Sequence, residues 1–295
     1  MCGRYALISA PEAIRALFRY AGQPNFPARY NVAPTQPVAI VRLARDQAEW
    51  EPVGRPDRAQ DSKIGARPDA KPVPTFAGRA PGERQFALVR WGFLPAWVKD
   101  PKSFALLINA RGESVLDKPA YRAAMKRRRC LIPADGFYEW QAAGNRKRPH
   151  FVRAKDGAPL AFAGLWETWT GPNGEELETA TIVTTRANRT LPPIHERMPV
   201  IVPPEAFDLW LDCANVDAET AAALIAPARE DLLEAYEISP AVNRVANDNP
   251  QLIAPVMPDE PDAAAAAKPA GQRAPAKRTP AKRAVKDDGG QGVLF

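Results

Sequence analysis

The chain has 295 residues, of which 45% are hydrophobic, so most of it can bury a core. Lys and Arg outnumber Asp and Glu by 40 to 34, and this net charge of +6 only weakly favours a nucleic acid as partner. We find neither a transmembrane-length apolar run nor a signal peptide, and we therefore expect a cytoplasmic protein that has no membrane partner.

Cysteine and histidine usage excludes several kinds of site. The cysteines Cys2, Cys130 and Cys213 lack CxxC spacing, which argues against a zinc ribbon and against a disulfide framework. His150 and His195 are too few for a His-rich metal site. Glycine-rich phosphate-binding loops are also missing, so we expect neither a metal nor a cofactor.

Apolar patterns predict many short elements. In chain order they are a strand at 4–8, a helix at 11–20, strands at 37–43 and 86–91, a helix at 119–127, strands at 129–133, 151–153, 160–165 and 179–184, and helices at 204–213 and 217–236. Short strands separated by turns are typical of a barrel or a sandwich. We therefore predict an α+β fold, a single compact domain with a barrel-like antiparallel core and peripheral helices.

Composition divides the chain into a domain and a tail. Residues 1–257 have the patterns of a folded domain, except for 55–84, which read as an exposed insertion. Residues 258–295 form a low-complexity Ala/Pro/Lys segment, which we expect to be disordered. This basic tail is either a solubilising linker or a tether that contacts nucleic acid.

Cys2 is the residue with the most distinctive chemistry. Removal of Met1 would give it an α-amine beside its thiol, and both groups have reactive fractions near neutral pH. Such a 1,2-aminothiol condenses with an aldehyde to a five-membered thiazolidine. The alternative is a cysteine at position 2 without a function.

Three further segments offer polar groups. Asn109 and Arg111 follow an apolar run, where they either line a site or form a turn and a surface ion pair. Glu139 lies between Tyr138 and Trp140, so it is either a partly desolvated acid/base group or an exposed strand residue. His195 follows two prolines in a predicted loop, which suits proton transfer.

Together these segments resemble one family. MCGRYAL, RYNVAPTQ, WGFLPAW, INARGES, CLIPADGFYEW, AFAGLWE, PPIHERMPVIV and SPAV…LIAPV occur in the family's order. The chain is similar to the SOS-response-associated peptidase (SRAP) family, which shields abasic sites in single-stranded DNA. The resemblance implies a β-rich domain with a positively charged DNA channel and a covalent bond from the mature N-terminal cysteine to the abasic deoxyribose.

The resemblance also implies roles for single residues. The catalytic set it implies is Cys2, Asn109, Glu139 and His195. The DNA-binding set is Arg4, Asn31, Pro34, Trp91, Trp97, Arg111 and Arg197. One departure is Val98, where some family members have a second tryptophan beside the lesion.

The family implies release of Met1 by the same residues and a lyase side activity through β-elimination. Two other functions remain open at this point. Cys2, His195 and Asn109 have the residue types of a cysteine peptidase triad that acts on other proteins. Tryptophans and arginines also suit a noncovalent module for single-stranded DNA. We expect a monomer that associates with the nucleoid when it binds DNA.

The C-terminus suggests a second partner. Gln291, Leu294 and Phe295 form the pattern QGVLF after a polar tail. This segment resembles peptides that bind the bacterial sliding clamp, in which the glutamine contacts the pocket edge and the Leu-Phe pair fills an apolar cleft. A chance match is the alternative.

Overall fold

The computed structural model describes residues 2–44 and 83–256. These residues belong to one compact unit, which spans Met1–Val256. Of the predicted insertion at 55–84, only its last two residues are described, and the second of them, Arg84, begins a strand. The predicted tail lies outside the described residues. No helix within the described part of the chain is long and apolar enough to cross a membrane.

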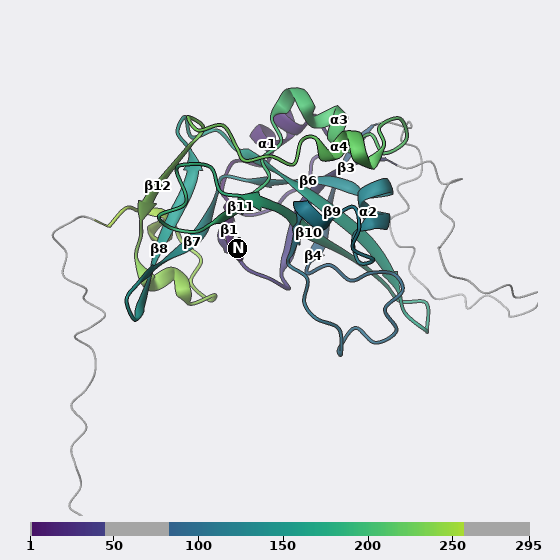
Figure 1. The fold of residues 1–295 in the computed structure, drawn as a ribbon, viewed down its shortest axis with the longest axis horizontal. Coiled ribbons are helices and arrows are strands. Elements are labelled where there is room, and N and C mark those ends of the chain that lie inside the picture. Colours follow the sequence, from purple (N-terminus) through teal and green to yellow (C-terminus); the bar gives the residue numbers. More distant parts are fainter. Residues whose placement is uncertain (1, 45–82, 257–295) are drawn as a thin grey trace, which may run out of the picture. The chain divides into compact units, whose positions relative to one another are not determined.

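Two sheets make up the unit (Figure 1). The five-stranded sheet has the order β12 (Leu233–Glu237), β8 (Arg146–Ala154), β7 (Gly136–Ala143), β1 (Tyr5–Leu7) and β2 (Arg29–Val32). The seven-stranded sheet has the order β11 (Arg197–Pro199), β10 (Glu176–Arg186), β4 (Arg84–Trp91), β3 (Pro37–Leu43), β6 (Arg129–Ala134) and β9 (Leu160–Thr170), with β5 (Asn109–Arg111) beside β10.

The larger sheet closes on itself. Strand β9 pairs with both β6 and β10, so β10, β4, β3, β6 and β9 form a five-stranded barrel. All pairings within this barrel are antiparallel except β10 with β4. The predicted barrel-like core is therefore confirmed, and closure removes the unpaired edges that an open sheet would expose.

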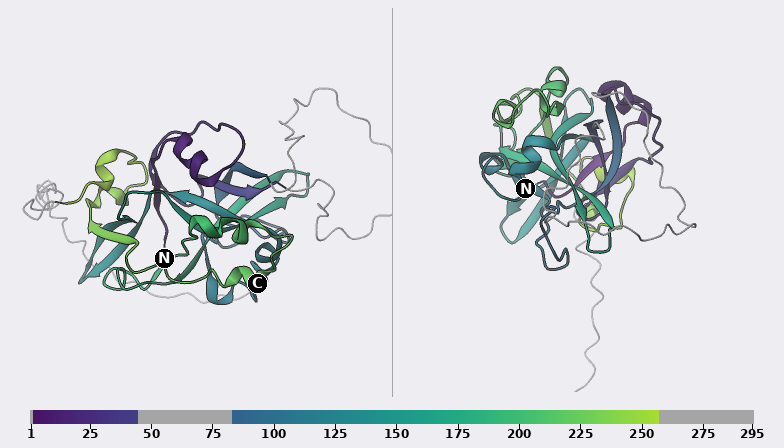
Figure 2. Two further views of the ribbon diagram at one scale, coloured as in Figure 1. Left: turned by 90° about the horizontal axis from the view of Figure 1, so that it is seen from above. Right: turned by 90° about the vertical axis from the view of Figure 1, so that its right-hand side faces the viewer.

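The helices are peripheral, as predicted, and they are short. They are α1 (Pro11–Phe18), α2 (Arg122–Arg127), α3 (Phe207–Leu211) and α4 (Ala218–Ala222), with 3-10 turns η2 (Gly112–Ser114), η3 (Pro204–Ala206), η4 (Pro240–Asn243) and η5 (Pro250–Ile253). Seen from above in Figure 2, α1 lies on the side of the unit away from the N-terminal end.

The predicted helix at 217–236 is wrong. Only Ala218–Ala222 is helical, and Leu233–Glu237 is a strand that pairs with β8. Pro227 removes a backbone donor and disfavours a helical residue before it, which ends the helical pattern. In this strand Glu234 lies opposite Arg153 of β8 and forms an ion pair with it at 2.7 Å.

Edge-to-face aromatic rings join the two sheets. Tyr5 of β1 packs against Trp91 with ring centroids 5.5 Å apart and against Phe162 at 6.2 Å. Phe137 of β7 contacts the same Phe162 ring at 5.9 Å. All four side chains are buried, so these contacts fix β1 and β7 of the five-stranded sheet against the barrel.

A buried arginine attaches α3 and the segment after it to the barrel. Arg129 is 1% exposed, and burial lowers its pKa. Its guanidinium donates at 2.6–2.9 Å to the backbone carbonyls of Trp210, Met125, Asp212 and Val216. A single side chain thus connects four backbone carbonyls of three segments, and of these the carbonyl of Asp212 also accepts the backbone N–H of Val216 at 3.1 Å.

We expect Arg129→Leu to lower the free energy of unfolding by about 3 kcal/mol or more, because it removes a buried donor from all four carbonyls at once. Urea unfolding followed by tryptophan fluorescence measures the change. Arg122→Leu removes an exposed arginine at the start of α2 and should stay within about 0.5 kcal/mol of the parent. Equal losses in the two variants would contradict the role of Arg129.

Candidate active site

The structure brings the four predicted catalytic residues together from distant parts of the chain. Cys2 precedes β1, Asn109 begins β5, Glu139 lies in β7, and His195 lies in the loop before β11. Strand β1 pairs with β7, whereas β5 and β11 both pair with β10. The site therefore lies where the five-stranded sheet meets strands attached to the barrel.

Two hydrogen bonds hold Cys2. Its thiol lies 3.7 Å from the carbonyl oxygen of Arg4, and the same oxygen accepts the backbone N–H of Tyr138 at 3.0 Å. The side-chain Nδ2 of Asn109 donates to the carbonyl oxygen of Cys2 at 2.9 Å. Cys2 is thus connected to β7 beside Glu139 and to β5 through Asn109.

The Cys2 thiol is held in its neutral form. It is fully buried, and burial together with the nearby charge of Glu139 raises its pKa far above the ordinary value. A neutral thiol is a poor nucleophile. A base must therefore take its proton before the sulfur can attack an electrophile.

Glu139 has the properties of such a base. It is 2% exposed, and burial raises its pKa to about 7. At neutral pH both its protonated and its ionised forms are therefore populated. A group of this kind can donate and accept protons in one reaction cycle. The reading of Glu139 as an exposed strand residue is wrong.

His195 faces this carboxyl group. Its Nε2 lies 4.0 Å from Oε2 of Glu139, and its Nδ1 is 3.0 Å from the backbone nitrogen of Arg197. Nδ1 also lies 3.3 Å from the carbonyl oxygen of Arg197, and because its contact with the N–H is the shorter one, we assign the ring proton of the neutral form to Nε2, on the Glu139 side. Burial lowers the pKa of His195, which favours the neutral ring.

Gln141 holds the loop that presents His195, and sequence reasoning missed it. Its Nε2 donates to the carbonyl oxygen of Pro193 at 2.8 Å. The backbone nitrogen of His195 also donates to the carbonyl oxygen of Leu191 at 2.8 Å. Gln141 lies two residues after Glu139, so strand periodicity puts both side chains on one face of β7. That alternation was the available signal.

Arg4 and Asn31 are committed to the fold. The Arg4 guanidinium donates to Oδ1 of Asn31 at 2.8 Å and to the carbonyl oxygen of Val242 at 2.9 Å. Asn31 is fully buried, and its Nδ2 donates to three carbonyl oxygens within 242–247. Both residues thus fasten this segment beside β1 and β2. Pro34 is half-buried in the turn after β2.

Two other predicted arginines differ in their partners. Arg197 donates to both carboxylate oxygens of Glu113, at 3.0 and 2.9 Å, and to the carbonyl oxygen of Thr184 at 2.7 Å. This contact lowers the pKa of Glu113, which sequence reasoning also missed. Arg111 is exposed at the end of β5. Arg111 therefore offers a charge to solvent, whereas Arg197 is largely enclosed.

The two tryptophans predicted to bind DNA differ in their exposure to solvent. Trp91 is fully buried, and its Nε1 donates to the carbonyl oxygen of Ile108, so its predicted role in base stacking is wrong. Trp97 is 59% exposed and has a free ring surface of the expected kind. Val98 is buried, and its carbonyl oxygen accepts from Nε1 of Trp169 at 2.6 Å. In this chain the position after Trp97 thus faces the interior.

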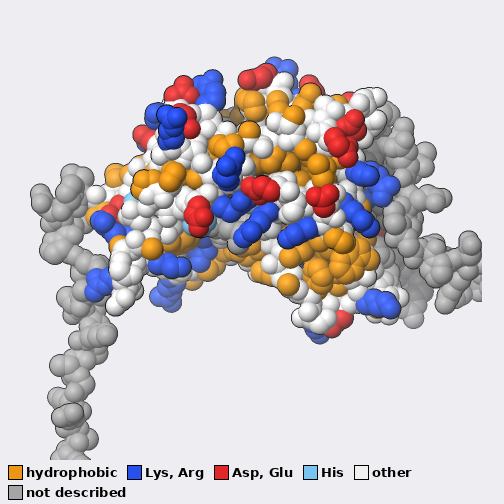
Figure 3. Space-filling view, in the orientation of Figure 1, with side chains coloured by type: hydrophobic (Ala, Val, Ile, Leu, Met, Phe, Trp, Pro, Cys, Tyr) orange, Lys and Arg blue, Asp and Glu red, His pale blue; other side chains and the backbone are white. Residues whose placement is uncertain are grey.

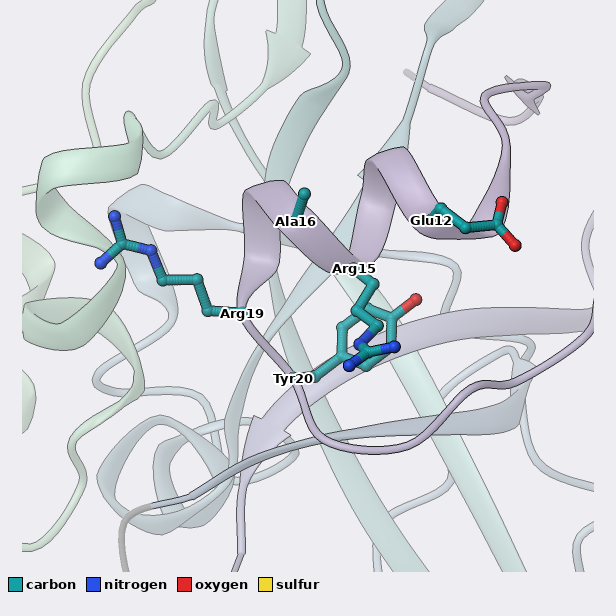
Figure 4. Close-up of a pocket in the computed structure, with 5 residues that line it drawn as sticks. All are labelled: Glu12, Arg15, Ala16, Arg19 and Tyr20. Carbon is teal, nitrogen blue, oxygen red and sulfur yellow. The ribbon is translucent and has the colours of Figure 1, made fainter.

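A hollow of about 470 Å³ lies beside α1, away from these residues, and is lined by Glu12, Arg15, Ala16, Arg19 and Tyr20. In Figure 4 the side chains of Arg19 and Glu12 point in opposite directions. Because its charged groups do not converge, we assign no site to this hollow. Among residues 2–44 and 83–256, no group of three His, Cys, Asp or Glu side chains is arranged to hold a metal.

Comparisons with known proteins agree on one family. The sequence model of the family described as SOS response associated peptidase (SRAP) matches residues 1–245. The abasic site processing protein YoqW of Bacillus subtilis is 34% identical over 257 residues, which cover 86% of this chain and 99% of YoqW. The abasic site processing protein HMCES of Gallus gallus is 36% identical over 213 residues, 63% of each chain.

Solved structures share the fold. A crystal structure from Bacteroides thetaiotaomicron has a TM-score of 0.68 at 21% identity and covers 87% of this chain and 100% of its own. A structure from Bordetella bronchiseptica has a TM-score of 0.60 at 25% identity, with 81% and 100% covered. The barrel with its attached sheet is thus a known architecture.

The raised pKa of Glu139 predicts a pH-dependent stability. The folded protein binds the carboxyl proton of Glu139 up to about pH 7, whereas the unfolded chain releases it at the lower, ordinary pKa of a glutamate. Proton binding therefore stabilises the folded state fully below that ordinary pKa, and this stabilisation is lost as the pH rises to 7. Glutamine does not titrate, so the Glu139→Gln variant does not lose stability in this way as the pH rises. We expect its unfolding free energy, relative to the parent, to rise between pH 5 and pH 8 by an amount on the order of 2 kcal/mol.

Urea unfolding at the two pH values measures this difference. Glu196→Gln, which removes an exposed carboxylate next to His195, is the matched control and should show no such rise. A constant difference between Glu139→Gln and the parent would contradict burial of an ionisable group at this position.

Proposed function

The chain belongs to the SOS response associated peptidase family, as its motifs predict, and we propose that it processes abasic sites in single-stranded DNA by a covalent bond through Cys2. One observation carries this proposal. A cysteine one residue from the N-terminus lies beside a buried carboxyl group with a pKa of about 7. The relatives are abasic site processing proteins, which supports the substrate class.

The reaction needs a free α-amine at Cys2, which removal of Met1 provides. The amine adds to the aldehyde of the ring-opened abasic sugar, and loss of hydroxide as water gives a Schiff base. The thiol sulfur then adds to the imine carbon and closes a thiazolidine. The water formed carries the aldehyde oxygen, one proton from the amine and one from the thiol.

Glu139 moves the protons in these steps. In its protonated form it gives a proton to the leaving hydroxyl group, and in its ionised form it accepts one from the thiol. This transfer is required because burial keeps the Cys2 thiol neutral. His195, with its Nε2 proton on the Glu139 side, assists opening of the sugar ring.

Asn109 positions the nucleophile. Its Nδ2 holds the carbonyl oxygen of Cys2, and its Oδ1 is buried without a hydrogen-bond partner among the described residues. A buried acceptor without a donor is unfavourable. The newly formed α-amine of Cys2 is the donor that would satisfy it, which orients the amine lone pair toward the aldehyde.

The same groups account for the other proposed activities. Release of Met1 is peptide-bond hydrolysis at Cys2, in which Glu139 and His195 again serve as acid and base. If the thiol does not close the ring, the Schiff base can undergo β-elimination and cut the strand, which is lyase chemistry. Ring closure is therefore the outcome that shields the lesion.

Two exposed side chains support the proposal that DNA is also bound outside the reaction centre. Arg111 offers an exposed positive charge two residues after Asn109. Trp97 is exposed and meets Phe104 edge to face at 5.6 Å, so one ring surface remains for a base. An apolar patch is visible at the lower right of the face in Figure 3, below a group of Lys and Arg side chains.

We expect Cys2→Ala to abolish the covalent product with abasic single-stranded DNA while leaving DNA affinity within about twofold. Denaturing gels and intact mass measure the product, and the mature parent should lack Met1. Cys213→Ala, at a half-buried cysteine, is the control and should crosslink normally. Cys2→Ser should give little product, because an oxazolidine is far less stable than a thiazolidine.

The same variant separates the alternatives. A peptidase acting on other proteins would lose turnover with Cys2→Ala without ever forming a DNA adduct. A noncovalent binding module would lose nothing. Full crosslinking by Cys2→Ser, or a mature mass that retains methionine, would contradict the proposed chemistry.

We also propose that Gln291, Leu294 and Phe295 recruit the protein to the sliding clamp. These residues lie outside the described part of the chain, so the support is the sequence pattern alone. If the tail is disordered, as its composition predicts, 35 residues would have a typical reach of roughly 30–35 Å, which would raise the local concentration of the protein at a replication fork.

A fluorescent peptide of residues 286–295 should bind purified clamp from the same organism, as measured by anisotropy. The double substitution Leu294→Ala/Phe295→Ala removes the apolar anchor and should abolish binding. Equal binding by both peptides, or none at high micromolar clamp, would refute recruitment and leave the Cys2 chemistry unaffected.

A further inference from the structure

Strand register places three arginines on one face of the sheet beside the site. Arg111 of β5 is level with Thr184 of β10, and Arg197 of β11 is level with Arg186 of β10. Thr184 and Arg186 are two residues apart, so they point to the same face. The contact between the Arg197 guanidinium and Oγ1 of Thr184, at 3.2 Å, confirms that this face is shared.

This face is the one that carries the reaction centre. Asn109, which holds Cys2, lies two residues before Arg111 and is level with Ile182 of β10. Arg186 is four positions after Ile182, which at about 3.3 Å per residue puts Arg186 about 13 Å further along the sheet. Arg186 thus lies at the outer end of a path that begins at Cys2.

Arg186 is the exposed member of an unfavourable pair. Like charges directly opposite each other on neighbouring strands destabilise a sheet. Glu113 compensates Arg197, whose side chain is only 15% exposed. Arg186 is exposed and forms no ion pair with the residues that the structure describes. Its position thus weakens the sheet slightly and leaves its guanidinium available to an external anion.

We propose that Arg186, together with Arg111, binds backbone phosphates of the DNA strand whose abasic sugar reaches Cys2. This inference rests on the proposed function and adds a binding residue that its motifs do not contain. The four charged groups Arg111, Arg186, Arg197 and Glu113 leave an excess of positive charge at this edge. In Figure 3, Lys and Arg side chains gather at the middle of the face where Figure 1 has β10 and β11.

Reversible binding of a fluorescent single-stranded oligonucleotide without an abasic site tests the proposal. Anisotropy titrations from 0.05 to 0.3 M salt give the affinity and its salt dependence. Each phosphate contact on a single strand contributes about 0.7 to the slope of log affinity against log salt. Arg186→Ala should therefore reduce the slope by about 0.7 and the affinity at 0.1 M salt by about fivefold.

Matched variants make the result specific. Arg15→Ala removes an exposed arginine of α1, away from this face, and should bind like the parent. Arg186→Lys keeps the charge and should retain the slope. Combining Arg111→Ala with Arg186→Ala should reduce the slope by about 1.4. Arg186→Ala should also unfold at an equal or higher urea concentration, which a structural role would not produce.

The outcomes separate this proposal from the proposed function. If the parent binds and crosslinks DNA but Arg186→Ala has the same slope as Arg15→Ala, Arg186 is no phosphate contact and the inference is refuted. If the parent shows no salt-dependent binding of single-stranded DNA, the proposed function itself fails.

Discussion

One backbone carbonyl, that of Arg4, determines where the amino-terminus lies. It accepts the N–H of Tyr138 and lies within reach of the Cys2 thiol. The first hydrogen bond continues the pairing of β1 with β7, and the thiol contact directs the side chain of Cys2 toward the same strand. Since Glu139 follows Tyr138, strand pairing alone puts nucleophile and carboxyl group side by side.

The site can hold a buried thiol next to a buried carboxyl group because packing and hydrogen bonds fix the strands around it. Tyr5 is packed between Trp91 and Phe162, and Asn31 and Arg4 fasten the 242–247 segment next to β1. A buried carboxyl with a pKa near 7 and a buried acceptor on Asn109 both oppose folding. Unfavourable polar groups of this kind persist where the rest of the structure determines the conformation and where chemistry uses them.

Local patterns in the sequence predicted much of the fold. The strand at 37–43 was predicted with its observed bounds, because β-branched residues between turn signals are a local property. The prediction of a helix at 217–236 was wrong because it followed the spacing of apolar residues and gave too little weight to Pro227, which ends a helix. Closure of the barrel through β9 and β10 is nonlocal, and no short pattern specifies that a strand pairs on both sides.

In the candidate site, too, local sequence patterns were predictable and nonlocal contacts were not. Residue chemistry and family motifs single out Cys2, Asn109, Glu139 and His195 as candidates, but their convergence depends on pairing between strands that are distant in the sequence, β1 with β7 and β5 with β10. Gln141 and Glu113 were missed because a hydrogen bond to a loop carbonyl and an ion pair across strands have no sequence signature. Trp91 was misassigned because a tryptophan at a strand end has the same pattern whether it packs inward or outward.

The structure changes the functional interpretation of the arginines more than that of any other residue type. Arg4 and Arg129 donate to protein oxygens, and the guanidinium of Arg197 contacts Glu113 and Thr184, so these three side chains already have partners within the fold. A guanidinium that is already satisfied gains little from a phosphate, because it must first give up internal hydrogen bonds. Binding of a polyanion therefore depends on the arginines that folding leaves exposed, and at this sheet edge those are Arg111 and Arg186. Net charge counts both kinds alike, which explains why a charge of +6 is a weak guide to DNA binding, whereas strand register is a sharper one.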